Sequence, residues 1–70
     1  SVESFIGSNR YLRGRTIDLL REVPRQSDAL YRRVAQSVAV GEDRYASILA
    51  ALVRDGLIEQ AQGWYQLKET

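Results

Sequence analysis

Apolar residues recur every three or four positions between residues 10 and 22, which places them on one side of a helix. A side-chain oxygen of Ser8 or Asn9 can cap the start of this helix. Pro24 ends it, because the residue before a proline is pushed out of helical dihedrals. Gly14 lowers the stability of the helix by about 1 kcal/mol relative to alanine. It therefore marks either a close approach of neighbouring backbone or a tolerated weak position. The expected buried residues are Leu12, Thr16, Ile17, Leu19, Leu20 and Val23.

A second, shorter helix is expected from Asp28 to about Gln36, with Ser27 as its cap. Asp28 suits the positive end of the helix dipole. Residues 37–41 then form a connector, because Gly41 and the acidic residues after it break the pattern. The helix and the connector contribute the apolar residues Leu30, Val34, Val38 and Val40, with Tyr31 as a further candidate for the inner face.

The clearest helical pattern lies between Glu42 and Asp55. Two acidic residues begin this helix and Arg54 lies near its end. Charges of these signs interact favourably with the two ends of the helix dipole. Gly56 fits the left-handed position that stops a helix. The apolar residues at helical spacing are Tyr45, Ile48, Leu49, Leu52 and Val53.

After Gly56 the pattern changes to two short alternating runs, Leu57–Gln60 and Trp64–Leu67, separated by a turn at residues 61–63. Three helices followed by a hairpin are the element order of a winged helix-turn-helix, a mainly α (α+β) fold in which the C-terminal β-hairpin is the wing. We therefore expect a lead-in or linker over residues 1–8, the winged-helix domain over residues 9–67, and a tail over residues 68–70.

Composition removes most chemistry from this chain. Its 70 residues suffice for one core, and it contains no cysteine and no histidine, so disulfides, zinc fingers, iron–sulfur ligation and Cys/His or Ser/His nucleophile pairs are excluded. We predict no catalytic residue, no metal ligand and no cofactor in this segment. No apolar run approaches the roughly 18 residues of a membrane span, and no secretory pattern precedes Gly7, so a cytoplasmic location without membrane contact is expected. A start at Ser1 without methionine suggests a segment of a longer protein.

Charge is unevenly distributed along the chain. Up to Arg33 there are seven basic and four acidic residues, whereas three basic and five acidic residues follow. An anionic partner should therefore prefer the first half of the chain.

Three stretches carry a narrower resemblance: Phe5–Arg15 with its Arg-Gly-Arg sequence, Leu19–Arg21, and Asp43–Ile58 ending in Asp-Gly-Leu-Ile. Together they resemble the C-terminal region of actinobacterial-type A/G-specific adenine DNA glycosylases, which are MutY-like. The resemblance implies a parent enzyme that removes adenine mispaired with oxidised guanine, using a helix-hairpin-helix core and a four-cysteine 4Fe-4S cluster. None of those parts maps onto these residues. The resemblance thus implies an accessory domain, with the cluster elsewhere in the parent chain.

In a helix-turn-helix, the N-terminal residues of the third helix normally reach base edges in the major groove. Here that end carries Glu42 and Asp43, which would face phosphates, so sequence-specific readout is not expected. Guanidinium groups hold phosphates well. Arg10 and Arg13 lie one turn apart and share a face, whereas Arg15 points away from both. The candidate DNA-binding residues are Arg10, Arg13, Arg15, Arg32, Arg33, Arg44, Arg54 and Trp64.

Each candidate has an alternative interpretation. The arginines are equally expected to form ion pairs, or to dock the domain on its parent's catalytic core. Trp64 could stack on a base or wedge into a groove, although covering the hairpin's own core is the favoured interpretation. The expected acidic partners are Glu3, Asp18, Glu22 and Asp28.

Two function classes follow from these alternatives. One is a DNA-proximal accessory module that adds sequence-independent contacts to the DNA backbone. The other is a protein-interaction or dimerisation winged helix, docking through the small residues Ala46, Ala50 and Ala51 and through the wing. A transcription regulator with a sequence-specific DNA-binding domain is a more distant third.

Overall fold

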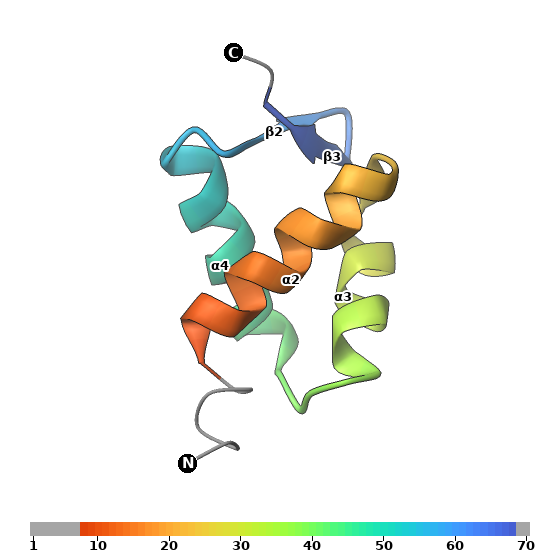
Figure 1. Ribbon diagram of the computed structural model, residues 1–70, viewed down its shortest axis with the longest axis vertical. Coiled ribbons are helices and arrows are strands. Elements are labelled where there is room, and N and C mark those ends of the chain that lie inside the picture. The colour runs from red at the N-terminus through yellow and green to blue at the C-terminus, as the bar shows by residue number, and fades with distance from the viewer. Residues whose placement is uncertain (1–7, 69–70) are drawn as a thin grey trace.

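Three helices and a three-stranded antiparallel sheet make up residues 8–68, the part of the chain that this computed structural model describes (Figure 1). The fold is α+β and its layout is compatible with a winged helix. The predicted lead-in residues 1–7 and tail residues 69–70 lie outside the described range. The elements are α2 (Asn9–Glu22), β1 (Arg25–Gln26), α3 (Ser27–Ala35), α4 (Glu42–Arg54), β2 (Ile58–Ala61) and β3 (Trp64–Leu67).

Two predicted helix ends are confirmed in atomic detail. The backbone N–H of Tyr11 donates to the Ser8 side chain at 3.2 Å, so Ser8 caps α2. After α4, Gly56 adopts a φ of 79° and its N–H donates to the carbonyl of Val53, while the N–H of Leu57 donates to that of Leu52. This pair of bonds is the Schellman pattern, which requires the left-handed backbone that glycine adopts without strain.

Two local predictions are wrong. Ser27 is the first residue of α3 and not its cap; the cap position is Gln26, which makes no side-chain capping bond. Val23 is 50% exposed although it continues the apolar stripe of α2. The helix ends at Glu22 and Val23 has extended dihedrals, because Pro24 follows it. Its side chain therefore leaves the helical face.

The sheet contains one strand more than the predicted hairpin. β3 is central, pairing with β2 on one side and with the two-residue strand β1 on the other. The hairpin turn is Gln62–Gly63, with φ of 54° and 82°, so Ala61 belongs to the strand and not to the turn. Positive φ at both positions is the turn geometry that matches the twist of paired strands.

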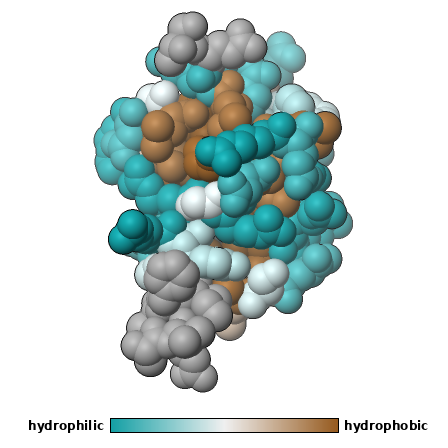
Figure 2. Space-filling view, viewed as in Figure 1, coloured by the Kyte–Doolittle hydropathy of each residue, from teal (hydrophilic) through white to brown (hydrophobic). Residues whose placement is uncertain are grey.

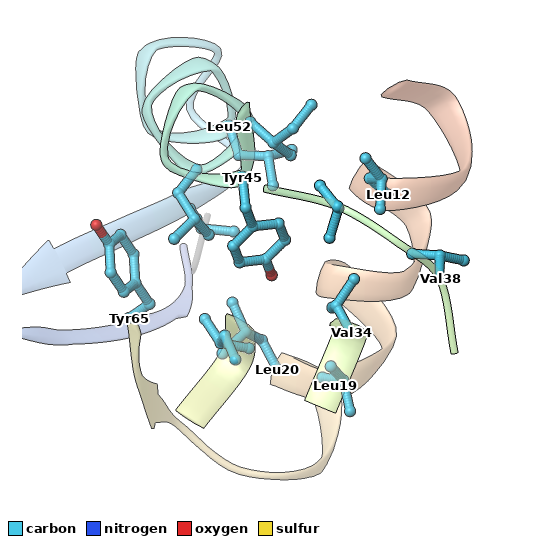
Figure 3. Close-up of a cluster of buried hydrophobic side chains, with 13 residues drawn as sticks. Leu12, Leu19, Leu20, Val34, Val38, Tyr45, Leu52 and Tyr65 are labelled. Atoms are coloured by element: carbon cyan, nitrogen blue, oxygen red, sulfur yellow. The ribbon is translucent and has the colours of Figure 1, made fainter. Parts of the chain in front are cut away.

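The core lies where the three helices meet the sheet, and Tyr45 is at its centre (Figure 3). α2 packs on both α3 and α4, whereas α3 and α4 contact each other less. Val38 and Val40 of the connector reach this core, as predicted. The buried apolar residues are Leu12, Leu19, Leu20, Leu30, Val34, Val38, Val40, Tyr45, Ile48, Leu49, Leu52, Ile58 and Tyr65.

A chain of two hydrogen bonds crosses this core. Thr16 Oγ1 donates to the carbonyl of Leu12 at 2.8 Å, and it lies 2.6 Å from the Tyr45 hydroxyl. A threonine hydroxyl has a single hydrogen, so Tyr45 must be the donor to Thr16. Both residues are essentially inaccessible to solvent. The bond therefore attaches α4 to α2 where water cannot replace either partner.

Thr16→Val is expected to lower the free energy of unfolding by about 1–3 kcal/mol, because it leaves the buried Tyr45 hydroxyl without an acceptor. In a Tyr45→Phe background the same change should cost less than about 1 kcal/mol, since no polar group is orphaned. Urea unfolding followed by Trp64 fluorescence measures both values. Equal costs in the two backgrounds would contradict the proposed bond.

The Tyr45 side chain also predicts a pH dependence. Burial raises the pKa of Tyr45 above its ordinary value of 10.0; the hydrogen bond with Thr16 acts in the opposite direction, and the charge of Tyr65 raises it further. Above pH 10 the unfolded chain loses this proton before the folded chain does, so stability falls as pH rises. The wild type should therefore lose more unfolding free energy than Tyr45→Phe between pH 8 and pH 11. A constant difference between the two proteins would rule this effect out.

Candidate nucleic-acid interface

The outer face of α2 carries a shallow hollow with an arginine on each side. The hollow has a volume of about 330 Å³ and is lined by Arg10, Tyr11, Gly14, Arg15 and Asp18. A Cβ built on Gly14 would meet no atom within 4 Å, so the glycine leaves this floor open. The close backbone approach considered for Gly14 is not made by any segment within residues 8–68.

Arg10 and Arg15 are the two candidate arginines without a partner in the structure. Neither forms an ion pair or side-chain hydrogen bond with any residue in 8–68. Arg15 was expected to point away from Arg10, and nevertheless both residues line the same hollow. Their five-residue spacing places them on opposite rims, with Gly14 between them.

Arg13, which was expected to act with Arg10, is engaged elsewhere. Its Nη2 lies 2.8 Å from Asp55 Oδ2, at the C-terminal end of α4. Both side chains are only partly exposed, and the bond links two segments that lie 42 residues apart in the sequence. Arg13 therefore has a structural partner.

The remaining arginines have weaker partners. Arg32 lies 3.6 Å from Asp28, Arg33 lies 3.9 Å from Glu22, and Arg54 lies 3.9 Å from Asp55. Two of these acids, Glu22 and Asp28, were among the expected partners, whereas Asp18 pairs instead with Arg21. Glu3 lies outside the described residues. Exposed pairs of this kind contribute about 0–1 kcal/mol, so they would yield readily to a phosphate.

The outermost row of α4 has little capacity to read bases. This row is Asp43, Ser47, Ala50 and Arg54, all exposed and opposite the buried side of the helix. The Ser47 hydroxyl donates to the helix carbonyl of Asp43 at 3.2 Å. Arg44 lies to the side and donates to Asn9 Oδ1 at 3.0 Å. Of these side chains only an arginine has the fork that a guanine contact needs.

Trp64 lies outside the core, which corrects the favoured interpretation of this residue. Its side chain is 47% exposed, while the next residue, Tyr65, is buried. Side chains alternate between the two faces of a strand, so burying Tyr65 turns Trp64 outward. Its neighbours across the sheet are Gln26 on β1 and Ala61 on β2.

A second depression, larger in volume than the first, lies between α3 and α4. It has a volume of about 460 Å³ and its lining includes the rings of Tyr31 and Tyr45. Ala46, which also lines this groove, was expected to belong to a protein-docking surface together with Ala50, Ala51 and the wing. The groove was not predicted, because it depends on the angle between two helices and not on either helix alone.

Within residues 8–68 no cluster of three or more acidic, cysteine or histidine residues could hold a metal ion. No helix in the same range is long and apolar enough to cross a membrane. Figure 2 shows polar side chains over most of one face, with an apolar patch in its upper part that polar side chains border and partly cross.

Comparison of the chain with protein-family models, with curated proteins and with solved structures finds no match in any of the three.

The open hollow predicts that Gly14→Ala raises the free energy of unfolding by about 0.5–1 kcal/mol. The new methyl group meets nothing within 4 Å, and alanine loses less backbone entropy in a helix. Gly56→Ala is the matched control, because a φ of 79° makes the same change unfavourable there. Thermal unfolding of both variants measures the effect. A loss of stability in Gly14→Ala would show that the hollow is closed in solution.

Proposed function

We propose that this domain is a winged helix that contacts the DNA backbone without reading its sequence, through α2 and not through its third helix. The observation that carries the proposal is the pair Arg10 and Arg15, which flank one hollow and have no partner among residues 8–68. A phosphate approaching the hollow would meet two guanidinium groups, which hold phosphate oxygens through forked hydrogen bonds. Gly14 has no side chain, so nothing at this position obstructs the approach.

The charges of the two helices support this choice of surface. α2 carries four arginines and two acidic residues, whereas α4 carries two arginines and two acidic residues. In α4 both acids occupy the first turn, which is the end that enters the major groove in a groove-reading helix. A carboxylate there meets a duplex with one negative charge per roughly 1.7 Å of axis. A sequence-specific transcription regulator is thus the less favoured assignment.

In the setting implied by the resemblance to MutY-like glycosylases, the domain would be an accessory of the catalytic core. Sequence-independent contact suits such a role, because a repair enzyme must scan any DNA sequence for its lesion. Phosphate contacts also let a protein slide along DNA. Adenine removal and the 4Fe-4S cluster would belong to the rest of the parent chain.

The expected binding of the 70-residue chain to a random-sequence duplex is weak, with a dissociation constant of about 10⁻⁴ to 10⁻⁶ M at physiological salt. Each phosphate contact contributes about 0.9 to the slope of log K against log salt concentration. Replacing both Arg10 and Arg15 by alanine should therefore reduce that slope by about 1.8 and weaken binding equally for different sequences. Fluorescence anisotropy at several salt concentrations measures both quantities.

The double variant Arg32→Ala with Arg54→Ala is the matched control, since it removes the same charge from α3 and α4. It should retain most of the salt dependence. The proposal fails if this control loses more binding than the α2 variant, or if the wild type shows no binding at low salt.

A further inference from the structure

The groove between α3 and α4 has an apolar floor that the hydrogen-bond network of the core holds in place. The floor consists of Tyr31, Tyr45, Ala46 and Leu49. The rings of the two tyrosines lie 6.0 Å apart at 50°, and the Tyr31 hydroxyl donates to the carbonyl of Val40 at 2.8 Å. Tyr45 is fixed on its other side by Thr16. Both hydroxyls are occupied, so the groove exists before any partner binds. Tyr45 and Leu49 are almost fully buried, so the accessible part of the floor is the half-buried Tyr31 ring with the exposed Ala46.

The apolar surface continues along α4 beyond the groove. Val53 lies one turn after Leu49, on the side of the helix that also carries Ala46, and its side chain is 36% exposed. Small or apolar residues therefore form a row along this side of α4. Such a row can accept the side chains of a segment laid against the helix.

The rim of the groove is net acidic. Its charged residues are Asp28, Arg32 and Glu42. Arg32 is already bound to Asp28, through Nη2 at 3.6 Å to the carboxylate and through Nε at 3.4 Å to the backbone carbonyl. Glu42 has no ion pair within the described part of the chain. The uncompensated charge at the rim is thus a single carboxylate beside an apolar floor.

We propose that this groove binds a segment of a partner protein that presents an apolar side chain next to a lysine or arginine. The apolar side chain would lie on the Tyr31 ring and Ala46, and the cation would pair with Glu42. A cation above a tyrosine face gains further from the ring quadrupole. A DNA strand is disfavoured at the same place, because Glu42 would face its phosphates. The proposal is independent of the α2 surface and stands whether or not that surface binds DNA.

Three small probes that share a phenylbutyl group test the charge preference directly: 4-phenylbutylamine, the neutral 4-phenylbutanol, and the anion 5-phenylpentanoate. Titrations with the 70-residue chain would be followed by the NMR shifts of the Ala46 methyl group and the Tyr31 ring. We expect saturable shifts with roughly millimolar affinity for the amine, which is normal for a ligand of about 11 heavy atoms. The alcohol should bind more weakly and the anion least.

Glu42→Gln should weaken amine binding roughly two- to fivefold, the size expected of one exposed ion pair, and leave alcohol binding unchanged. Asp43→Asn is the matched control: it removes the neighbouring charge of the same helix turn but does not line the groove. Its amine affinity should stay near that of the wild type. Ala46→Leu, which fills the floor with a good helix former, should abolish the Tyr31 ring shifts from all three probes.

The proposal is overturned if the amine produces no saturable shift at Ala46, or if Glu42→Gln and Asp43→Asn weaken amine binding equally. Preferential binding of the anion would also overturn it, because the groove would then favour an anionic partner.

Discussion

The buried hydrogen bond from Tyr45 to Thr16 determines how the helices of this chain sit relative to one another. A tyrosine hydroxyl that is buried without an acceptor costs about 1–3 kcal/mol, so α4 must approach α2 at the one place where Thr16 offers a lone pair. Thr16 in turn uses its own hydrogen on the helix carbonyl of Leu12. On the other side, the Tyr31 ring contacts Tyr45 and its hydroxyl is fixed by the connector at Val40. A domain of this size has a small hydrophobic core. These hydrogen-bonded side chains therefore favour one arrangement of the three helices.

That arrangement separates two surfaces of opposite character. α2 turns Arg10 and Arg15 outward around a hollow, while α3 and α4 diverge and leave a groove with an acidic rim. A groove-reading winged helix would concentrate its basic residues on the third helix. Here the first turn of that helix is acidic, and the unpaired arginines lie on another element. The proposed division of labour, phosphate contact on α2 and protein contact between α3 and α4, follows from this distribution of charge.

Helix ends and the buried side of each helix could be predicted from the sequence, because they depend on local signals. Ser8 and Gly56 mark their ends by side-chain or backbone chemistry that acts within four residues. The strand β1 could not be predicted, since Arg25 and Gln26 form a strand only because β3 pairs with them. Val23 was misassigned for a related reason: its spacing is helical, but Pro24 removes it from the helix.

The candidate site was predictable in its residue types but not in its grouping. All the candidate arginines are exposed or partly exposed, as expected. Their spacing along α2, however, predicted that Arg10 would act together with Arg13. Asp55, 42 residues further along, takes Arg13 out of that pair, and the open position at Gly14 joins Arg10 to Arg15. Contacts between distant segments decide such groupings. The most direct test of the central claim, that DNA meets α2 and not the third helix, is a map of backbone amide shifts on titration with a random-sequence duplex. The claim predicts that the largest shifts fall in α2 between Arg10 and Arg15. Shifts concentrated on Asp43, Ser47, Ala50 and Arg54 would contradict it.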